Sequence, residues 1–454
     1  AFVYEAQTNV LGKLAPLNPG EGYELEAWEV AEQGKARALM DLLEDGSTRS
    51  VSVDRAWKDV GQGVDLATLR TAALPTDKDL ILEYALGDSG SYVWAITRKG
   101  MTLHRLPDKK KIQDTSRLLR RSLEEDVSRL RGRAPTTTET PVLSWRDHAT
   151  ALGDMLLAPV AEVVQMASRV AIIPDGALHY VPFEMLVQGS SKQYALEGKT
   201  VRYAPSAGVL ARLSLLQRHP GLPEPFLGVG DPVFNGQAAK TVASVEPVVQ
   251  GAFRSGIPGT GETRLLPLPN TRKEVITIGQ FFDKERPRLL LGAEATEANL
   301  KEPGFLSRFR ILHFATHGLT DERFPKRCCL ALSAADSASD AFLEAEEIYA
   351  LPVRADLVVL SACETGKGRM VRGEGVLGLP RAFLHAGARN VVVSLWSVSD
   401  EGTADLMTSF YREMIQKKRP AAEALARAKQ DMMRSDEWHH PFYWAGFVLI
   451  GPGQ

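Results

Sequence analysis

The sequence predicts an α/β fold in which a mostly parallel sheet is flanked by helices. From about residue 223 onward, short and almost continuous apolar runs alternate with helix-like segments. Strands that are buried on both faces and separated by helices are typical of parallel sheets, because the crossover helices cover both faces. The apolar runs read PFLGVGDPVF, RPRLLLG, RFRILHFAT, ADLVVLSAC, ARNVVVSLW and WAGFVLIG, and the helix-like segments span 271–282, 296–302, 373–386, 400–417 and 420–434.

In the first half of the chain, the spacing of apolar residues predicts helices and hairpins rather than buried parallel strands. Residues 21–43 place apolar side chains at helical spacing and charges elsewhere, which predicts an amphipathic helix. Residues 79–106 contain three β-rich runs interrupted by glycine-containing turns, which predicts a meander of hairpins. Further helices are predicted over 108–131 and 144–167, and the charges of 108–131 have mixed signs that indicate a solvated face rather than a nucleic-acid footprint.

Two segments have the composition of connections. Residues 134–140, APTTTET, indicate a flexible linker, and residues 236–263, rich in glycine and small side chains, indicate a mobile loop. Pro223 and Pro225 mark a domain boundary. We therefore expect three parts, comprising residues 1–74, 75–222 and 223–454.

The overall composition limits the possible functions. The chain has 454 residues, of which 44% are hydrophobic, and its 54 Lys and Arg nearly balance its 56 Asp and Glu. This balance gives no electrostatic reason to expect nucleic acid or a membrane as the main partner. There are three cysteines, which cannot all pair, and we find neither a signal peptide nor a spanning apolar stretch. We therefore expect a cytoplasmic protein.

Two predicted strands end in residues that carry chemistry. RFRILHFATHG ends with His317 and Gly318, and ADLVVLSACETG ends with Cys363. The carboxyl ends of parallel strands share one edge of the sheet, so neighbouring strands would bring an imidazole and a thiol together. A cysteine nucleophile needs this arrangement, because the thiolate is reactive and the imidazole stabilises it or moves its proton. The backbone N–H groups of Gly318 and Cys363 can converge on an oxyanion.

The residues alone leave other interpretations open. A single cysteine at a strand end is often a small buried hydrophobe, and a single histidine is often a structural group. HFATH, followed by Cys328 and Cys329, does not form a zinc site, because strand residues four apart lie about 13 Å from each other. GEGVLG at 373–378 lies too far from its strand to bind a dinucleotide. We expect no metal and no cofactor, a structural role for His313, and aromatic packing around His439 and His440.

Several motifs together resemble one known family. The segments ILHFATHG, DLVVLSACETG, GEGVLGLPRAFLHAGARNVVVSLWSVSD and HPFYWAGFVLIG resemble the CHAT domain, a caspase-like domain often fused to TPR repeats, and more distantly separase. The resemblance extends over residues 75–452, and residues 28–43 resemble the helix that joins the repeats to this domain. It implies a caspase-like fold, with a non-catalytic caspase-like half at 75–222, the catalytic domain at 223–454 and the end of a repeat module at 1–74.

The resemblance also implies an activity. The family includes cysteine endopeptidases, and its motifs align with His317 and Cys363 as the catalytic dyad and with the backbone of Gly318 and Cys363 as oxyanion donors. These two side chains are 46 residues apart, close to the roughly 50 of caspases. By similarity to separase, Asp400 would line a pocket for a basic P1 side chain and Trp396 would form its wall. The segment SDEGTADLM also fits an N-cap that opens a helix, which would give Asp400 a structural role instead.

The expected function is cleavage of a partner protein under the control of a regulatory protein or a sensor or repeat module, with a role in prokaryotic antiviral defence or cell death. The alternative is a catalytically silent caspase-fold scaffold. Acyl transfer to an acceptor other than water would use the same dyad. The substrate, the trigger and the oligomeric state are not encoded in any recognisable motif.

Overall fold

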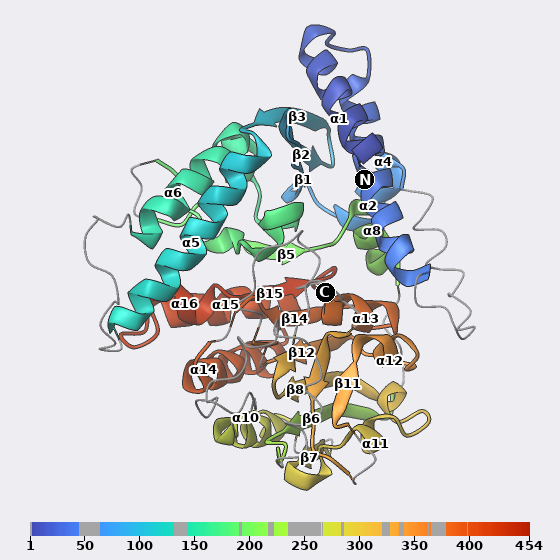
Figure 1. Cartoon of the computed structure of the whole chain (residues 1–454), viewed down its shortest axis with the longest axis vertical. Coiled ribbons are helices and arrows are strands. Elements are labelled where there is room, and N and C mark those ends of the chain that lie inside the picture. The colour runs from blue at the N-terminus through green and yellow to red at the C-terminus, as the bar shows by residue number, and fades with distance from the viewer. Residues whose placement is uncertain are drawn as a thin grey trace, which may run out of the picture. The chain divides into compact units, whose positions relative to one another are not determined.

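The computed structural model comprises two compact units, Ala1–Leu216 and Gln217–Gln454 (Figure 1). The described residues are 2–44, 64–130, 144–189, 193–216, 222–234, 265, 267–282, 286–319, 327–335, 340–361, 363–364, 378–396 and 398–454. The predicted linker at 134–140 and the predicted loop at 236–263 lie outside them. The division into three parts, at residues 74 and 222, stays a prediction.

The first unit contains a mixed sheet with the order β3-β2-β1-β4-β5. Its strands are β1 (Asp79–Ala85), β2 (Ser91–Thr97), β3 (Met101–Leu106), β4 (Arg169–Ile173) and β5 (Thr200–Tyr203). The pairs β1–β2 and β2–β3 are antiparallel, which confirms the predicted meander. β4 pairs parallel with β1 and with β5, so this unit also has a parallel part.

Helices surround this sheet. They are α1 (Phe2–Leu14), α2 (Tyr23–Glu44), α4 (Leu66–Ala73), α5 (Lys109–Leu130), α6 (Trp145–Leu156), α7 (Ala161–Met166) and α8 (Ala207–Leu215). The helices predicted over 21–43 and 108–131 are confirmed as α2 and α5. The single helix predicted over 144–167 is wrong in one respect, because Pro159 lies in a 3-10 turn that separates α6 from α7.

The described part of the chain holds no single helix that is long and apolar enough to cross a membrane. Within those same residues, one bent pair, α6 with residues 158–166, reaches that length and composition, and its two parts meet at 45°.

Helix α2 is fixed to the first unit by apolar and charged contacts. Trp28 is fully buried in the core, and its indole N–H donates a 2.7 Å hydrogen bond to Glu83 Oε2 on β1. Lys35 Nζ lies 2.7 Å from the other oxygen of the same carboxylate. Glu32 accepts hydrogen bonds of 2.9 Å from the backbone N–H groups of Ala207 and Gly208. The Glu32 carboxylate therefore binds the amino-terminal end of α8.

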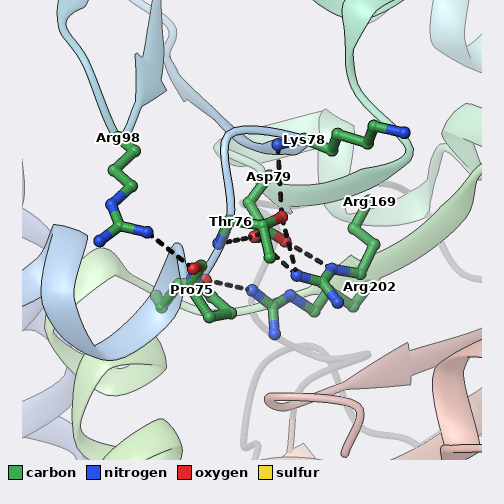
Figure 2. Close-up of polar contacts among 8 residues, drawn as sticks. Pro75, Thr76, Lys78, Asp79, Arg98, Arg169 and Arg202 are labelled. Carbon is green, nitrogen blue, oxygen red and sulfur yellow. Dashed lines mark hydrogen bonds and ion pairs between the residues drawn. The ribbon is translucent and has the colours of Figure 1, made fainter.

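Asp79 organises a polar cluster where β1 and β4 begin (Figure 2). Arg169 donates to both carboxylate oxygens, at 2.6 and 2.7 Å, and the backbone and hydroxyl of Thr76 add bonds of 2.7 and 2.8 Å. Burial alone would raise the pKa of Asp79, but the hydrogen bonds from Arg169 and Thr76 outweigh it and lower the pKa. The ionised carboxylate is thus fully bonded although Asp79 is buried.

Two more arginines tie the same region to the backbone (Figure 2). Arg98 donates a 2.9 Å bond to the carbonyl oxygen of Pro75, and Arg202 donates a 2.8 Å bond to that of Ala73. Burial lowers the pKa of Arg202 to about 10. These bonds hold the segment between α4 and β1.

We expect Arg169→Ala to destabilise the first unit by about 1–3 kcal/mol, because the variant leaves a buried carboxylate without its bidentate donor. Arg98→Ala removes one exposed bond in the same cluster, and we expect a change within about 0.5 kcal/mol. Urea unfolding monitored by circular dichroism measures both. Equal effects of the two substitutions would contradict the assigned role of Asp79.

The second unit contains a nearly all-parallel sheet with the order β15-β14-β12-β8-β6-β7. Its strands are β6 (Glu224–Gly230), β7 (Arg288–Leu291), β8 (Phe309–Ala315), β12 (Leu357–Leu360), β14 (Val391–Ser394) and β15 (Phe447–Ile450). Every adjacent pair is parallel except β14–β15. The six apolar runs are therefore confirmed as strands, and the predicted fold class is confirmed.

Helices lie on both sides of these strands, with α10 and α14 on one side and α12 and α13 on the other (Figure 1). The helices are α10 (Pro269–Gln280), α11 (Glu297–Leu300), α12 (Ala345–Tyr349), α13 (Gly378–His385), α14 (Asp400–Tyr411), α15 (Ala421–Met433) and α16 (Pro441–Trp444). A π-helical turn, Arg412–Gln416, extends α14. All five predicted helical segments thus contain a helix.

Helix α10 approaches β6 closely because two residues of that strand lack side chains. A Cβ placed on Gly228 would lie 2.6 Å from Val275 Cγ1, and one on Gly230 would lie 2.8 Å from Val275 Cγ2. We expect Gly228→Ala to lower the stability of the second unit by about 1–3 kcal/mol through overpacking. Gly100→Ala is the control, since no atom lies within 4 Å of its Cβ position. Thermal melts compare the two, and a Gly228→Ala variant as stable as the control would contradict this packing.

Candidate active site

The two strands that precede His317 and Cys363 are neighbours in the sheet. β8 and β12 pair in parallel, with Phe314 opposite Leu360. The backbone N–H of Ser361 then donates a 2.9 Å bond to the carbonyl oxygen of Phe314. Both strands therefore end at the same edge, as the sequence predicts.

Beyond this edge the chain forms a second, smaller sheet. Its strands are β9 (Gly318–Leu319), β10 (Cys329–Ala331), β11 (Phe342–Glu344) and β13 (Cys363–Glu364), in the order β11-β10-β9-β13. β13 pairs in parallel with β9, and Cys363 lies opposite Gly318. Paired strands are about 4.8 Å apart. The backbone of Cys363 therefore lies beside the residue that directly follows His317.

The backbone around His317 is held by β10. The carbonyl oxygen of His317 accepts a 2.9 Å bond from the backbone N–H of Ala331, and the Thr316 hydroxyl donates to the carbonyl oxygen of Ala331. The imidazole is buried, with 4% of His317 exposed, and its ring centroid lies 5.3 Å from that of Phe234. The backbone at His317 is therefore fixed by β10, and the buried imidazole packs against an aromatic side chain.

Phe234 is a site residue that sequence reasoning missed. It follows β6, and two contacts fix the chain before it. Asp231 adopts a left-handed backbone with φ of 51° and pairs with Arg272 at 2.6 Å, and the backbone N–H of Val233 donates a 2.8 Å bond to Ser333 Oγ. The signal in the sequence was that Phe234 is the last residue of the apolar run PFLGVGDPVF.

A buried polar network lies beneath the two strand ends. His313 is fully buried in β8, with Nε2 3.0 Å from Glu274 Oε1 and Nδ1 3.1 Å from the Tyr411 hydroxyl. The Ser361 hydroxyl donates to the same oxygen of Glu274. Burial raises the pKa of Tyr411, and the Glu274 charge adds to that shift. His313 is therefore a hydrogen-bonded residue inside its strand, as expected.

Asp400 and Trp396 follow the next strand of the sheet, β14, which pairs in parallel with β12. Asp400 is the first residue of α14, and its preceding residue, Ser399, caps that helix. Burial raises the pKa of Asp400, and the Glu274 and Glu401 charges raise it further. Trp396 is buried, and its indole N–H donates a 2.8 Å bond to the carbonyl oxygen of Phe442. Their predicted pocket roles stay predictions.

The remaining cysteines have a different environment from a reactive thiol. Cys328 and Cys329 are both buried, and neither forms a disulfide within the described part of the chain. Burial raises the pKa of Cys329, with further increases from Cys328 and nearby carboxylates. Among the described residues, no group of three or more His, Cys, Asp or Glu side chains is arranged to hold a metal ion. Cys328 and Cys329 therefore lack the features of a nucleophile.

The structure describes part of the GEGVLG segment and the surroundings of His440. Within GEGVLG, residues 373–377 lie outside the described residues and Gly378 begins α13. His440 accepts a 3.3 Å bond from the backbone N–H of Phe442 and thereby caps α16, and its ring lies 6.5 Å from that of Tyr443. His440 thus takes part in aromatic packing, as expected.

The CHAT domain family model matches residues 146–452, which is more than half of the chain. The chain belongs to the CHAT domain family. The fold of this CHAT protein is the caspase-like one that the sequence motifs imply. A chain of the Saccharomyces cerevisiae separase–securin complex superposes on it with a TM-score of 0.52 and 11% identity, over 99% of this chain and 36% of that chain. At such identity the likeness establishes the fold alone.

Curated relatives of this CHAT protein are much longer. Tetratricopeptide repeat protein 28 of Mus musculus is 25% identical over 384 residues, which are 74% of this chain and 15% of that protein. The Homo sapiens protein of the same name is 25% identical over 344 residues, which are 66% of this chain and 13% of that protein. The chain therefore spans about one seventh of these relatives.

Proposed function

We propose that this CHAT protein is a cysteine endopeptidase in which Cys363 is the nucleophile and His317 the general base and acid. One observation carries the proposal, namely the parallel pairing of Cys363 with Gly318 at the shared edge of β8 and β12. This register supports the proposal because it puts the backbone of a cysteine next to that of a histidine at the ligand-binding edge of an α/β sheet.

The proposed reaction has two steps. The Cys363 sulfur attacks the scissile carbonyl carbon, His317 takes the thiol proton, and the backbone N–H groups of Gly318 and Cys363 bind the oxyanion. The C–N bond then breaks, and His317 gives the proton to the leaving amine. Water next attacks the thioester with His317 as base, the C–S bond breaks, and the free thiol returns.

We also propose that Asp400 selects substrates with Arg or Lys at P1. The charges that act on this carboxylate are Glu274 and Glu401, and both raise its pKa, so the local field is negative. A guanidinium or ammonium group would relieve this repulsion and form charge-assisted hydrogen bonds. Trp396 follows the same strand and would bound the pocket.

Regulation by a partner or repeat module forms part of the proposal. Only 4% of His317 is exposed, and Phe234 lies against its ring, so a substrate would reach the imidazole only after a local rearrangement. The relatives are named for tetratricopeptide repeats, which supports a repeat module as the element that triggers the rearrangement. A role in prokaryotic defence or cell death rests on the family resemblance alone, since these relatives come from mouse and human.

The burial of His317 also favours the second candidate, a scaffold that keeps the fold without catalysis. A peptidyl acyloxymethyl ketone with Arg at P1 separates the two. An endopeptidase would be labelled at Cys363 and not at the buried Cys328 and Cys329, with mass spectrometry of tryptic fragments as the readout. Equally slow labelling of all three cysteines, with and without an added tetratricopeptide repeat module, would reject the endopeptidase.

A further inference from the structure

Glu274 is a buried carboxylate that the proposed reaction does not use. It lies on α10, is 2% exposed, and one of its oxygens accepts from both His313 Nε2 and Ser361 Oγ. His313 is in β8, whereas Ser361 directly follows β12. One carboxylate oxygen therefore joins the two strands that lead to His317 and Cys363.

A purely structural origin is a poor explanation for this network. Burying a carboxylate costs several kcal/mol unless the bonding is complete, and apolar side chains of similar volume often stabilise a core better. His313, Ser361 and Tyr411 are each at most 3% exposed, so the network is shielded from water. Such a network, when satisfied, makes the local geometry more rigid and more specific.

The bonded residues are close to the strand ends along the chain. Ser361 precedes Cys363 by two residues, a separation of at most about 7 Å. His313 precedes His317 by four residues. Because so few residues separate each pair, a shift of Ser361 relative to His313 would be transmitted to the residues at the edge.

The close contact between α10 and β6 sets the position of Glu274. Val275, the next residue of α10, fills the space above Gly228 and Gly230, so the helix approaches the sheet closely. The Glu274 charge also raises the pKa of Asp400 at the start of α14. Glu274 therefore acts near the ends of three strands. It bonds His313 within β8 and Ser361 just after β12, and its charge acts on Asp400, which follows β14.

We propose that Glu274 is a positioning residue that fixes the ends of β8 and β12 against each other and thereby aligns Cys363 with His317. This inference rests on the proposed endopeptidase function. Its consequence is that the loss of the Glu274–Ser361 bond changes the reactivity of the Cys363 thiol, although neither residue touches the substrate.

The test measures the second-order rate of iodoacetamide alkylation at Cys363 by mass spectrometry, alongside melting temperatures. We expect Glu274→Ala to reduce this rate by about tenfold or more and Ser361→Ala by about threefold, because small misplacements of reacting groups have large effects on rate. Glu274→Gln keeps an acceptor oxygen, and we expect it to restore most of the rate. With a cleavable peptide, we expect Glu274→Ala and Ser361→Ala to lower kcat and to change KM by less than about twofold.

Glu32→Gln is the matched control, since Glu32 is equally buried in the first unit and bonds the start of α8. We expect it to lower the melting temperature without changing alkylation at Cys363. If Glu274→Ala does not fold, Ser361→Ala decides the outcome. A folded Glu274→Ala or Ser361→Ala variant that reacts at the wild-type rate would overturn the positioning role. A wild-type protein that cleaves nothing, yet whose Cys363 reactivity depends on Glu274, would reject the protease and keep the positioning role.

Discussion

Cys363→Ala should reduce peptide cleavage by about 10⁴-fold or more, since removal of a nucleophile leaves only binding and oxyanion stabilisation. The substitution removes one sulfur atom after the end of β12 and should leave the fold intact. A set of protein substrates, incubated with activated wild-type and variant protein and analysed by sequencing of new amino termini, measures the loss.

Cys328→Ala is the control for this experiment. Its sulfur is buried just before β10, so we expect lower stability but a cleavage rate within about threefold of wild type. Cleavage products that are identical in amount for the wild type and Cys363→Ala would mean that another residue, or a contaminating protease, performs the reaction.

Asp400→Asn should reduce kcat/KM for peptides with Arg at P1 by about 10²–10³-fold and leave peptides with Gln at P1 nearly unchanged. The physical reason is the loss of charge-assisted hydrogen bonds to the guanidinium in a partly buried site. Glu401→Gln removes an equal charge from the next residue, which is exposed, and we expect less than about a threefold change. Equal losses for Arg and Gln peptides would show that Asp400 supports the helix rather than the pocket.

The pH dependence gives the same prediction a second readout. The pKa of Asp400 is raised by burial and by the Glu274 and Glu401 charges, so its carboxyl is protonated at a higher pH than an ordinary aspartate. Cleavage of Arg peptides should therefore weaken as the pH falls through this raised pKa, because the neutral acid no longer attracts the guanidinium. Asp400→Asn should lack this acidic limb. Because burial disfavours the ionised form, removal of the charge should not destabilise the fold at neutral pH.

The strands of the second unit could be predicted because each is an almost continuous apolar run. β8 and β12 are examples, but their adjacency was only a condition of the predicted site, and the structure supplies it. The order of all six strands could not be predicted, because it depends on which crossover passes over which face. The two-residue strands β9 and β13 are too short to show any alternation of apolar and polar residues. Their pairing depends on the positions of β8 and β12, which they follow.

The supporting residues of the site were invisible in the sequence for a different reason. Glu274 follows Arg272 and Lys273 and has the pattern of a surface position, yet it is buried. Its partners His313 and Ser361 lie 39 and 87 residues away. Phe234 likewise meets His317 across 83 residues of chain. Such contacts depend on tertiary packing. Those of Glu274, for example, require the glycines of β6 that allow α10 to approach the sheet.

The most direct test of the account is the pH dependence of alkylation at Cys363 in the wild type and in His317→Ala. If the two strand ends bring thiol and imidazole together, the wild-type thiol should react with an apparent pKa below the usual 8.5 or so, and His317→Ala should return it to that value. An identical titration of Cys363 in both proteins, in the presence of the activating module, would contradict the account.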